Sequence, residues 1–118
     1  MTDIETLLLT QKECCEFYDA VFSPINNEQL VVISDGVYEG DPVEGVRYQS
    51  PKHMTGWWVT TDRYNGDVDS LKTVHFSHII EKRPDLAIYM ALPSGYRFIL
   101  GGADDSVWFD EVVAKEPS

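Results

Sequence analysis

Two short runs of strand-forming residues near the C-terminal end of the sequence fix how that region can fold. The runs YRFILGG and SVWFD are about five residues apart and are joined by residues 101–105. A connection this short favours an antiparallel hairpin. Gly101 and Gly102 could belong to a phosphate-binding loop, but the glycines of such a loop open a helix, whereas here a second strand follows. Asp104 and Asp105 also stand where an anion would bind, so the sequence predicts a hairpin and not a nucleotide site.

Residues 2–22 have the pattern of an amphipathic helix. Thr2 and Glu5 have the spacing of a capping box, in which each side chain bonds the backbone amide of the other residue. Pro24, followed by two asparagines, ends the pattern. Apolar residues recur at three- and four-residue spacing, as expected for one buried stripe: Ile4, Leu7, Leu8, Cys15, Tyr18 and Phe22.

The next part of the chain contains two further strand-like runs. QLVVISD (29–35) and GWWVTTD (56–62) are rich in β-branched and aromatic residues, which are typical of strands. The segment between them, residues 36–53, holds glycines and prolines and has little periodicity. It predicts a long surface loop with a short strand near residues 46–48.

From residue 70 to residue 92 the apolar spacing is helical again. Pro84 interrupts this pattern because it has no amide hydrogen and clashes with the preceding turn of a helix. We therefore expect two short helices joined at residues 82–84, with Pro84 at the start of the second one.

Together these patterns predict one α+β domain over residues 1–118, with residues 112–118 as a frayed tail. The N-terminal helix and the helix pair should pack on one antiparallel-rich sheet of four or five strands. Trp57 and Trp58 are adjacent in a strand and point to opposite faces, so one should lie in the core and the other be exposed or in an interface. The residues expected to be buried are Leu7, Leu8, Tyr18, Val32, Ile79, Leu86, Phe98 and Leu100.

The composition limits the partners that this chain can bind. It has 20 acidic and 9 basic residues, for a formal net charge of −11. Such a charge repels nucleic acids and anionic membrane surfaces, and it speeds the encounter with a basic partner. Charge alone fits equally well with a role in keeping a cytosolic protein soluble.

The cysteines and the N-terminal residues indicate a cytoplasmic protein. Cys14 and Cys15 are neighbours in the predicted helix and point away from each other, which argues against a disulfide framework. The first ten residues lack the basic region of a signal peptide, and no run approaches the roughly 18 apolar residues of a membrane helix.

Catalytic and metal-binding patterns are weak. The acidic turn 62–69 is similar to a calcium loop around Gly66, but two of the three preceding ligand positions do not fit, and position twelve is Lys72. The two cysteines lie along a helix without a glycine turn that would expose a nucleophile. We therefore expect no enzymatic activity and no cofactor.

A histidine pair provides the main alternative. His75 and His78 are three residues apart on a predicted helix and could bind one metal ion, with Glu81 as the nearest third ligand. A part-buried histidine that is bonded to the backbone or to a carboxylate is the commoner case. A small metal-binding protein or enzyme that uses His75 and His78 is thus an alternative function, as is a general ligand-binding or adaptor module.

Four segments carry a family resemblance. LLLTQKECCEFYDAVFSP, TGWWV, LPSGYRF and DSVWFD, in this order, resemble the immunity-protein-33-like family of bacterial polymorphic toxin systems. The similarity spans about residues 4–111 and is weakest through 37–52 and 62–69. It implies a small cytosolic inhibitor that binds a cognate toxin domain and blocks it, and it implies no catalytic residues.

If the chain binds a toxin, the contact residues should lie in segments that do not build the core. The partner would be a cognate toxin domain, for example a basic nuclease, and the protein itself a monomer or weak homodimer. Acidic residues would attract the partner and tyrosines would anchor it. The predicted contact residues are Asp35, Tyr38, Glu39, Asp41, Glu44 and Tyr48 in the first loop, Asp62, Tyr64, Asp67 and Asp69 in the turn, and Asp104 and Asp105 in the hairpin.

A chelator tests whether a metal ion supports the fold. A structural metal contributes folding free energy that a chelator removes, which lowers the melting temperature. Because we expect no such metal, the melting temperature should stay within about one degree after EDTA treatment. The measurement is a thermal melt of protein purified without an affinity tag. A decrease of many degrees would show that His75 and His78 have a metal-binding role.

Overall fold

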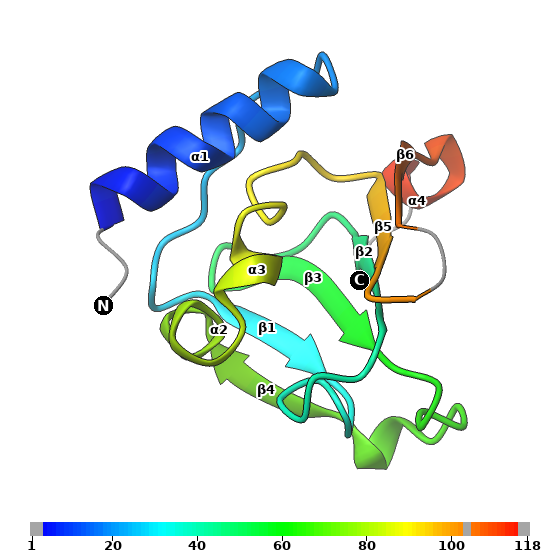
Figure 1. Cartoon of the computed structure of the whole chain (residues 1–118). Helices are drawn as coiled ribbons and strands as arrows, with labels where there is room; N and C mark the ends of the chain where they lie inside the picture. Colours follow the sequence, from blue (N-terminus) through cyan, green and yellow to red (C-terminus); the bar gives the residue numbers. More distant parts are fainter. Residues whose placement is uncertain (1–3, 103–104, 116–118) are drawn as a thin grey trace.

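The computed structural model describes residues 4–102 and 105–115, which form an α+β domain on one mixed sheet (Figure 1). The order of strands is β4-β1-β3-β2-β5-β6; β1 and β3 are parallel, and the other neighbouring strands are antiparallel. The strands are β1 (Leu30–Ile33), β2 (Val43–Arg47), β3 (Met54–Thr60), β4 (Lys72–His75), β5 (Tyr96–Leu100) and β6 (Ser106–Phe109). The helices are α1 (Ile4–Phe17), α2 (Phe76–Lys82), α3 (Pro84–Ala87), α4 (Glu111–Lys115) and the 3₁₀ turn η1 (Val68–Ser70).

The fold class is confirmed, but the described residues form six strands where four or five were expected. The unexpected strand is β4, which lies in the segment predicted to be helical. It pairs with β1 from Lys72 opposite Ile33 to His75 opposite Leu30. Val74 is half-buried between exposed neighbours, which is the alternation of an edge strand. This alternation spans only four residues. In the sequence it is masked by the helical spacing of the apolar residues that follow it.

The helix pair is confirmed, with Pro84 in the first turn of α3. Helix α1 ends at Phe17, before the predicted end at residue 22. Asp19 has a φ of 54°, and the amide of Ala20 donates to the carbonyl oxygen of Cys15 at 2.8 Å, so the chain leaves the helix through a left-handed turn. The predicted capping residue Thr2 lies outside the described residues.

The prediction of a frayed tail from residue 112 is wrong for residues 112–115, which lie in helix α4. Val113 is buried, and the side-chain amide of Gln49 donates to the carbonyl oxygen of Ala114 at 2.7 Å. These contacts fix the helix beside the end of β2. None of the helices in the described part of the chain has the length and apolar composition needed to cross a membrane.

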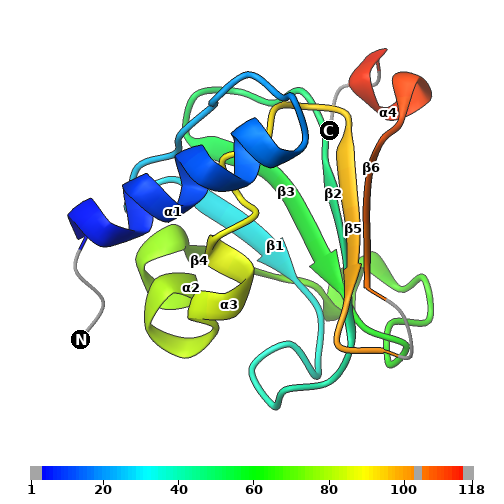
Figure 2. The same cartoon turned by 45° about the horizontal axis from the view of Figure 1, so that its top comes forward.

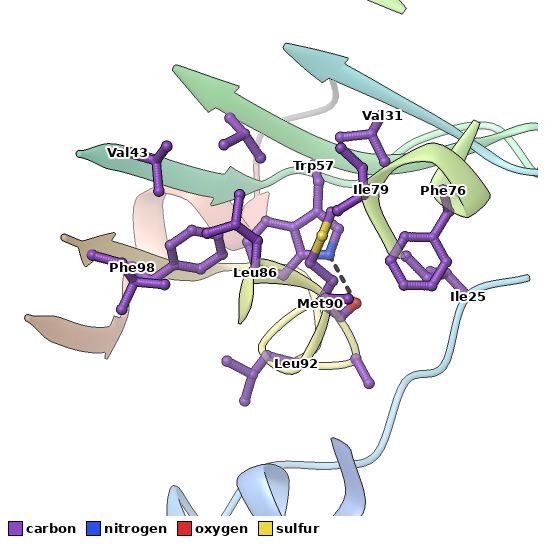
Figure 3. Packing of buried hydrophobic residues seen from close by; sticks show 14 of the residues in the cluster. Ile25, Val31, Val43, Trp57, Phe76, Ile79, Leu86, Met90, Leu92 and Phe98 are labelled. Carbon is purple, nitrogen blue, oxygen red and sulfur yellow. Dashed lines mark hydrogen bonds between the residues drawn. The ribbon is translucent and has the colours of Figure 1, made fainter. Parts of the chain in front are cut away.

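Helices α1, α2 and α3 lie on the same side of the sheet in both views (Figures 1 and 2). Between them and the sheet lies the core, which Figure 3 shows from close by. Trp57 and Phe98 point from the sheet into this layer, with ring centroids 5.2 Å apart. Leu86 and Met90 come from the helical side and are fully buried against them.

Most of the predicted core is confirmed. Leu7, Val32, Ile79, Leu86, Phe98 and Leu100 are buried, and Tyr18 is half-buried. The prediction for Leu8 is wrong, because its side chain is 37% exposed. Helix α1 contacts the core through a narrower stripe than the sequence indicated, one that includes the buried polar residue Gln11. Trp57 is fully buried and Trp58 is half-buried, as predicted for adjacent strand residues.

Arg47 ties the helical layer to the sheet. Its Nη1 donates to the carbonyl oxygens of Ser23 at 3.0 Å and Leu92 at 2.7 Å, and its Nε donates to the carbonyl oxygen of Thr55 at 2.9 Å. Trp57 adds a further bond, from its indole nitrogen to the carbonyl oxygen of Met90 at 2.9 Å (Figure 3). Burial lowers the pKa of Arg47 to about 10, which still leaves it charged at neutral pH.

Gly56 lets β3 pass close to the chain that follows β2. Its φ is +86°, and a Cβ atom there would overlap the carbonyl oxygen of Tyr48. The pairing of β1 with β3 shifts register at this level, since Leu30 pairs with Met54 whereas Val32 pairs with Trp58. Strand β3 thus has two more residues than β1 over this stretch, and a glycine with a left-handed backbone is one of the forms that such a bulge takes.

We expect Gly56→Ala to destabilise the fold by about 3 kcal/mol or more, because it adds both a backbone clash and left-handed strain. Gly40→Ala is the matched control: its φ is +88°, but nothing lies within 4 Å of its Cβ position. The control should cost only the strain, about 1 kcal/mol. Denaturant unfolding measures the free energy of unfolding of both variants. Equal losses of free energy would show that the backbone clash at Gly56 does not contribute.

Candidate functional site

The direction of the strands places the three predicted contact segments at one end of the sheet. Strands β1, β3 and β5 run toward this end, and β2, β4 and β6 begin there, as the pairing of Glu44 with both Thr60 and Ile99 illustrates. The connections at this end lie together in the lower part of Figure 2. We call the described residues of these connections, 35–42, 61–69 and 101–105, the acidic end.

Polar contacts join the first two segments of the acidic end. The hydroxyl of Thr61 donates to the carbonyl oxygen of Asp35. Arg63 and Asp41 form an ion pair with an Nε–Oδ2 distance of 2.7 Å. The amide of Asp41 in turn donates to the carbonyl oxygen of Gly36 at 3.2 Å, which closes the first loop on itself. The two segments therefore form one surface.

Two glycines allow this close approach. Gly36 has a φ of +97°, and a Cβ atom there would lie 2.7 Å from Oδ2 of Asp41 and 2.9 Å from the hydroxyl of Thr61. Gly101 has a φ of +84°, and its Cβ position is 3.4 Å from the Cα atom of Pro42. The hairpin thus borders the first loop, and the acidic end is continuous across all three segments.

Carboxylates outnumber cations in the acidic end. Arg63 is the one basic residue among its described residues, and Asp41 already pairs with it. The remaining carboxylates repel one another, and a basic surface would relieve this repulsion. The exposed ones belong to Asp35, Glu39, Asp62, Asp67, Asp69 and Asp105.

The predicted tyrosines do not all lie at the acidic end. Tyr38 is exposed there, and burial of part of its ring, followed by the charge of Glu81, raises its pKa. Tyr64 is half-buried, and its amide donates to the carbonyl oxygen of Thr61 at 3.0 Å. Tyr48 follows the opposite end of β2, where its ring is 6.2 Å from that of Trp58. The structure therefore separates Tyr48 from the other predicted contact residues.

Glu44 lies just beyond the acidic end, on the face of the sheet away from helices α1–α3. It forms an ion pair with Arg97. Beside it is a groove of about 240 Å³, whose lining includes Glu44, Asp62 and Ile99. Asp104 was also predicted as a contact residue and lies outside the described residues.

The histidine pair does not form a complete metal site in the described residues. His75 is the last residue of β4 and His78 lies in α2, so they do not share a helix as predicted. Their ring centroids are 6.0 Å apart, and both residues are exposed. No group of three or more histidine, cysteine, aspartate or glutamate side chains in residues 4–102 and 105–115 could hold a metal ion.

The cysteines have the properties of packing residues. Both are free thiols; Cys15 is buried, and its sulfur lies 3.5 Å from the carbonyl oxygen of Ala91. Burial, followed by the neighbouring Cys15, raises the pKa of Cys14 to about 11. A thiol with this pKa is almost entirely protonated at neutral pH, which is the opposite of an activated nucleophile.

Two arginines that support the acidic end were not predicted from the sequence. Arg63 holds Asp41, and Arg83 donates from Nη1 to the carbonyl oxygen of Val37 at 2.6 Å. Arg83 is itself held by Asp85, with an Nη2–Oδ2 distance of 3.0 Å. For Arg63 the sequence signal was a single cation within an acidic segment, whereas Arg83 follows Lys82 and gave no such signal.

Residues 10–110 match the family model of the Imm33-like domain, and the chain belongs to this family. The match includes all six strands and most of α1, so it covers the whole scaffold that presents the acidic end. It confirms the resemblance seen in the sequence. No curated protein and no solved structure matches the chain.

The Arg83–Asp85 pair generates a prediction about acid stability. Hydrogen bonds from Arg83 are the largest cause of the lowered pKa of Asp85, so ionised Asp85 stabilises the folded state. This contribution is present above the unfolded pKa and is lost as the pH falls through the folded one. Asp85 is largely exposed, so Asp85→Asn should cost only about 0.5–1 kcal/mol at pH 7.

The difference between Asp85→Asn and the parent should shrink as the pH falls below about 4. Denaturant unfolding at several pH values measures it. Asp69→Asn is the control, because its exposed side chain forms no hydrogen bond or ion pair in the described part of the chain. A pH-independent cost for Asp85→Asn would mean that the ion pair does not contribute.

Proposed function

We propose that this protein is an immunity protein that binds a cognate bacterial toxin domain through its acidic end and neutralises it. The observation that carries the proposal is the convergence of three acidic connections at one end of an Imm33-like domain. Family membership supports the immunity role, and the geometry supports the location of the contact. The proposal includes no catalytic step, and it places the protein in the cytoplasm as a monomer or weak homodimer.

The charge of the acidic end favours a basic partner. Exposed carboxylates on three contiguous loops attract a cationic surface over a distance set by the salt concentration, about 8 Å at physiological ionic strength. Toxin domains that cleave nucleic acid need a basic surface to hold their substrate, so a basic nuclease is the partner class that fits best. Nucleic acid and anionic membranes would be repelled by the same surface.

The location of the loops also suits recognition of one toxin among related ones. The segments 37–52 and 62–69, where the resemblance to the family is weakest, overlap the first two loops of the acidic end. Exposed residues of such loops can change without altering the core, whereas Val37 in the first loop is fully buried in it. Tyr38 and Tyr64 are placed to serve as aromatic contacts in this surface, whereas Tyr48 would require a partner that extends to the other end of the sheet.

Charge reversal tests the acidic end. We expect the adjacent upstream gene to encode the toxin domain, and we expect the double variant Asp62→Lys/Asp69→Lys to associate with that domain on the order of tenfold more slowly than the parent. The loss should shrink at high salt, because screening removes the long-range attraction. Stopped-flow or biosensor kinetics at two salt concentrations measure this. The pair Asp104→Lys/Asp105→Lys tests the hairpin in the same way.

The matched control is Glu28→Lys, compared with the single variants Asp62→Lys and Asp69→Lys. Glu28 is exposed and precedes β1, near the opposite end of the sheet. Each single reversal changes the net charge by the same amount, so a similar slowing in the control would indicate an effect of total charge. If both acidic-end variants associate at the rate of the parent and fully protect cells that express the toxin, the acidic end is excluded as the contact surface.

A further inference from the structure

A band of aromatic side chains lies on the helical side of the domain, outside the predicted contact residues. It runs from the end of α1 across the turn after α3 to the β5–β6 hairpin. Two of its rings are exposed to solvent, and a contiguous group of exposed apolar side chains is typical of contact surfaces. We call Phe17, Tyr18, Tyr89, Tyr96 and Phe109 the aromatic band.

Neighbouring rings in the band touch. The rings of Phe17 and Tyr18 meet edge to face with centroids 4.9 Å apart, and those of Tyr96 and Phe109 do so at 5.4 Å. The hydroxyl of Tyr96 donates to the carbonyl oxygen of Tyr18 at 3.4 Å, which joins the two pairs. Tyr89 lies 5.8 Å from the buried ring of Phe98. The band is therefore anchored in the core at its centre.

The two ends of the band are the exposed parts. Phe17 is 81% exposed and Phe109 is 48% exposed, whereas the three tyrosines are half-buried. Beside Phe17 is a groove of about 280 Å³, whose lining includes Tyr18, Ile88 and Tyr89. A groove of this size, walled by rings that the core holds in place, can receive one side chain of a partner.

The surroundings of the band are negatively charged. Glu13 lines the same groove. Burial is the main cause of the raised pKa of Tyr89, and charges that include Asp105 and Asp85 raise it further. Asp105 also belongs to the acidic end, so the charge of one acidic-end carboxylate acts on the band. Aromatic faces next to carboxylates favour cations, because both the ring quadrupole and the carboxylate attract positive charge.

We propose that the aromatic band is a second contact surface for the toxin domain, which places lysine or arginine side chains against its rings. This inference rests on the proposed function and specifies the chemistry of the partner's contact. A second copy of the chain is a poorer occupant, because two molecules with a net charge of −11 would bring their carboxylates together. A basic surface can form cation–π contacts with the rings and ion pairs with the carboxylates at the same time.

The two surfaces should affect different kinetic steps. Exposed carboxylates act mainly on association and lose their effect in salt, whereas a packed aromatic contact acts mainly on dissociation. We expect Phe17→Ala and Phe109→Ala each to speed dissociation of the toxin domain on the order of tenfold. The change should be nearly the same at low and high salt, with the association rate close to that of the parent.

Leu9→Ala is the matched control for Phe17→Ala. Leu9 lies on the same helix and is 59% exposed, but it does not line the groove. Thermal melts identify any variant that loses stability. Because Phe17 is so exposed, its replacement should leave the melting temperature nearly unchanged and so report on the contact alone.

The sign of the partner's charge is tested at the same position. Phe17→Lys should slow association and speed dissociation more than Phe17→Ala, while Phe17→Glu should restore part of the loss at low salt. Equal behaviour of the lysine and glutamate variants would overturn the cationic contact.

The outcomes separate this inference from the function on which it rests. If the parent binds and the acidic-end variants weaken binding, but Phe17→Ala and Phe109→Ala dissociate like Leu9→Ala, the aromatic band is not a contact and the immunity role stands. If the parent protein does not bind the adjacent toxin domain, the proposed function and the band's role both fail.

Discussion

The guanidinium of Arg47 lies over the ring of Trp57 and donates hydrogen bonds to carbonyl oxygens of three separate chain segments. Ser23 and Leu92 belong to the helical side of the domain, and Thr55 lies in β3. A buried carbonyl oxygen without a donor costs free energy, and a buried cation without acceptors costs more, so these groups depend on one another. The chain after α1 and the chain after α3 are thereby held at fixed places over the sheet. Tyr18 precedes Ser23 in the first segment and Tyr96 follows Leu92 after the second, so this half-buried cation helps to position both parts of the aromatic band.

The polarity of the strands has a comparable effect on the acidic end. Once β1, β3 and β5 run in one direction, their outgoing connections must emerge at the same end, whatever residues those connections contain. The scaffold therefore gathers the loops, and local contacts only adjust how closely they meet. Gly36 permits the approach of the first two segments, and Arg63 offsets one of the carboxylates that would otherwise repel. The fold tolerates exposed carboxylates there because most of the buried core lies between the helices and the sheet.

Several elements could be predicted from sequence because a single local rule governs them. Pro84 can only begin a helix, and the short span between β5 and β6 can only form a hairpin. What could not be predicted depends on partners that are distant in the sequence. The strand Lys72–His75 exists because β1 lies beside it, and Leu8 is exposed because α1 touches the core along a narrow stripe. The aromatic band was missed for the same reason, since its rings come from α1, the turn after α3, and β5 and β6, and each ring alone fits a core residue.

A surface that combines the acidic end with the aromatic band would divide recognition between two physical interactions of different range. Carboxylates act before contact and distinguish partners mainly by the sign and spacing of charge. Rings act only after water has been excluded, and they distinguish partners by shape. Asp105 closes the hairpin of the acidic end by accepting a bond from the amide of Gly101 at 2.9 Å, and its charge adds to burial in raising the pKa of Tyr89 in the band. Substitutions in the loops would then change which toxin domain associates with the protein. The aromatic band, which contacts the core through Phe98, would determine how slowly that toxin domain dissociates.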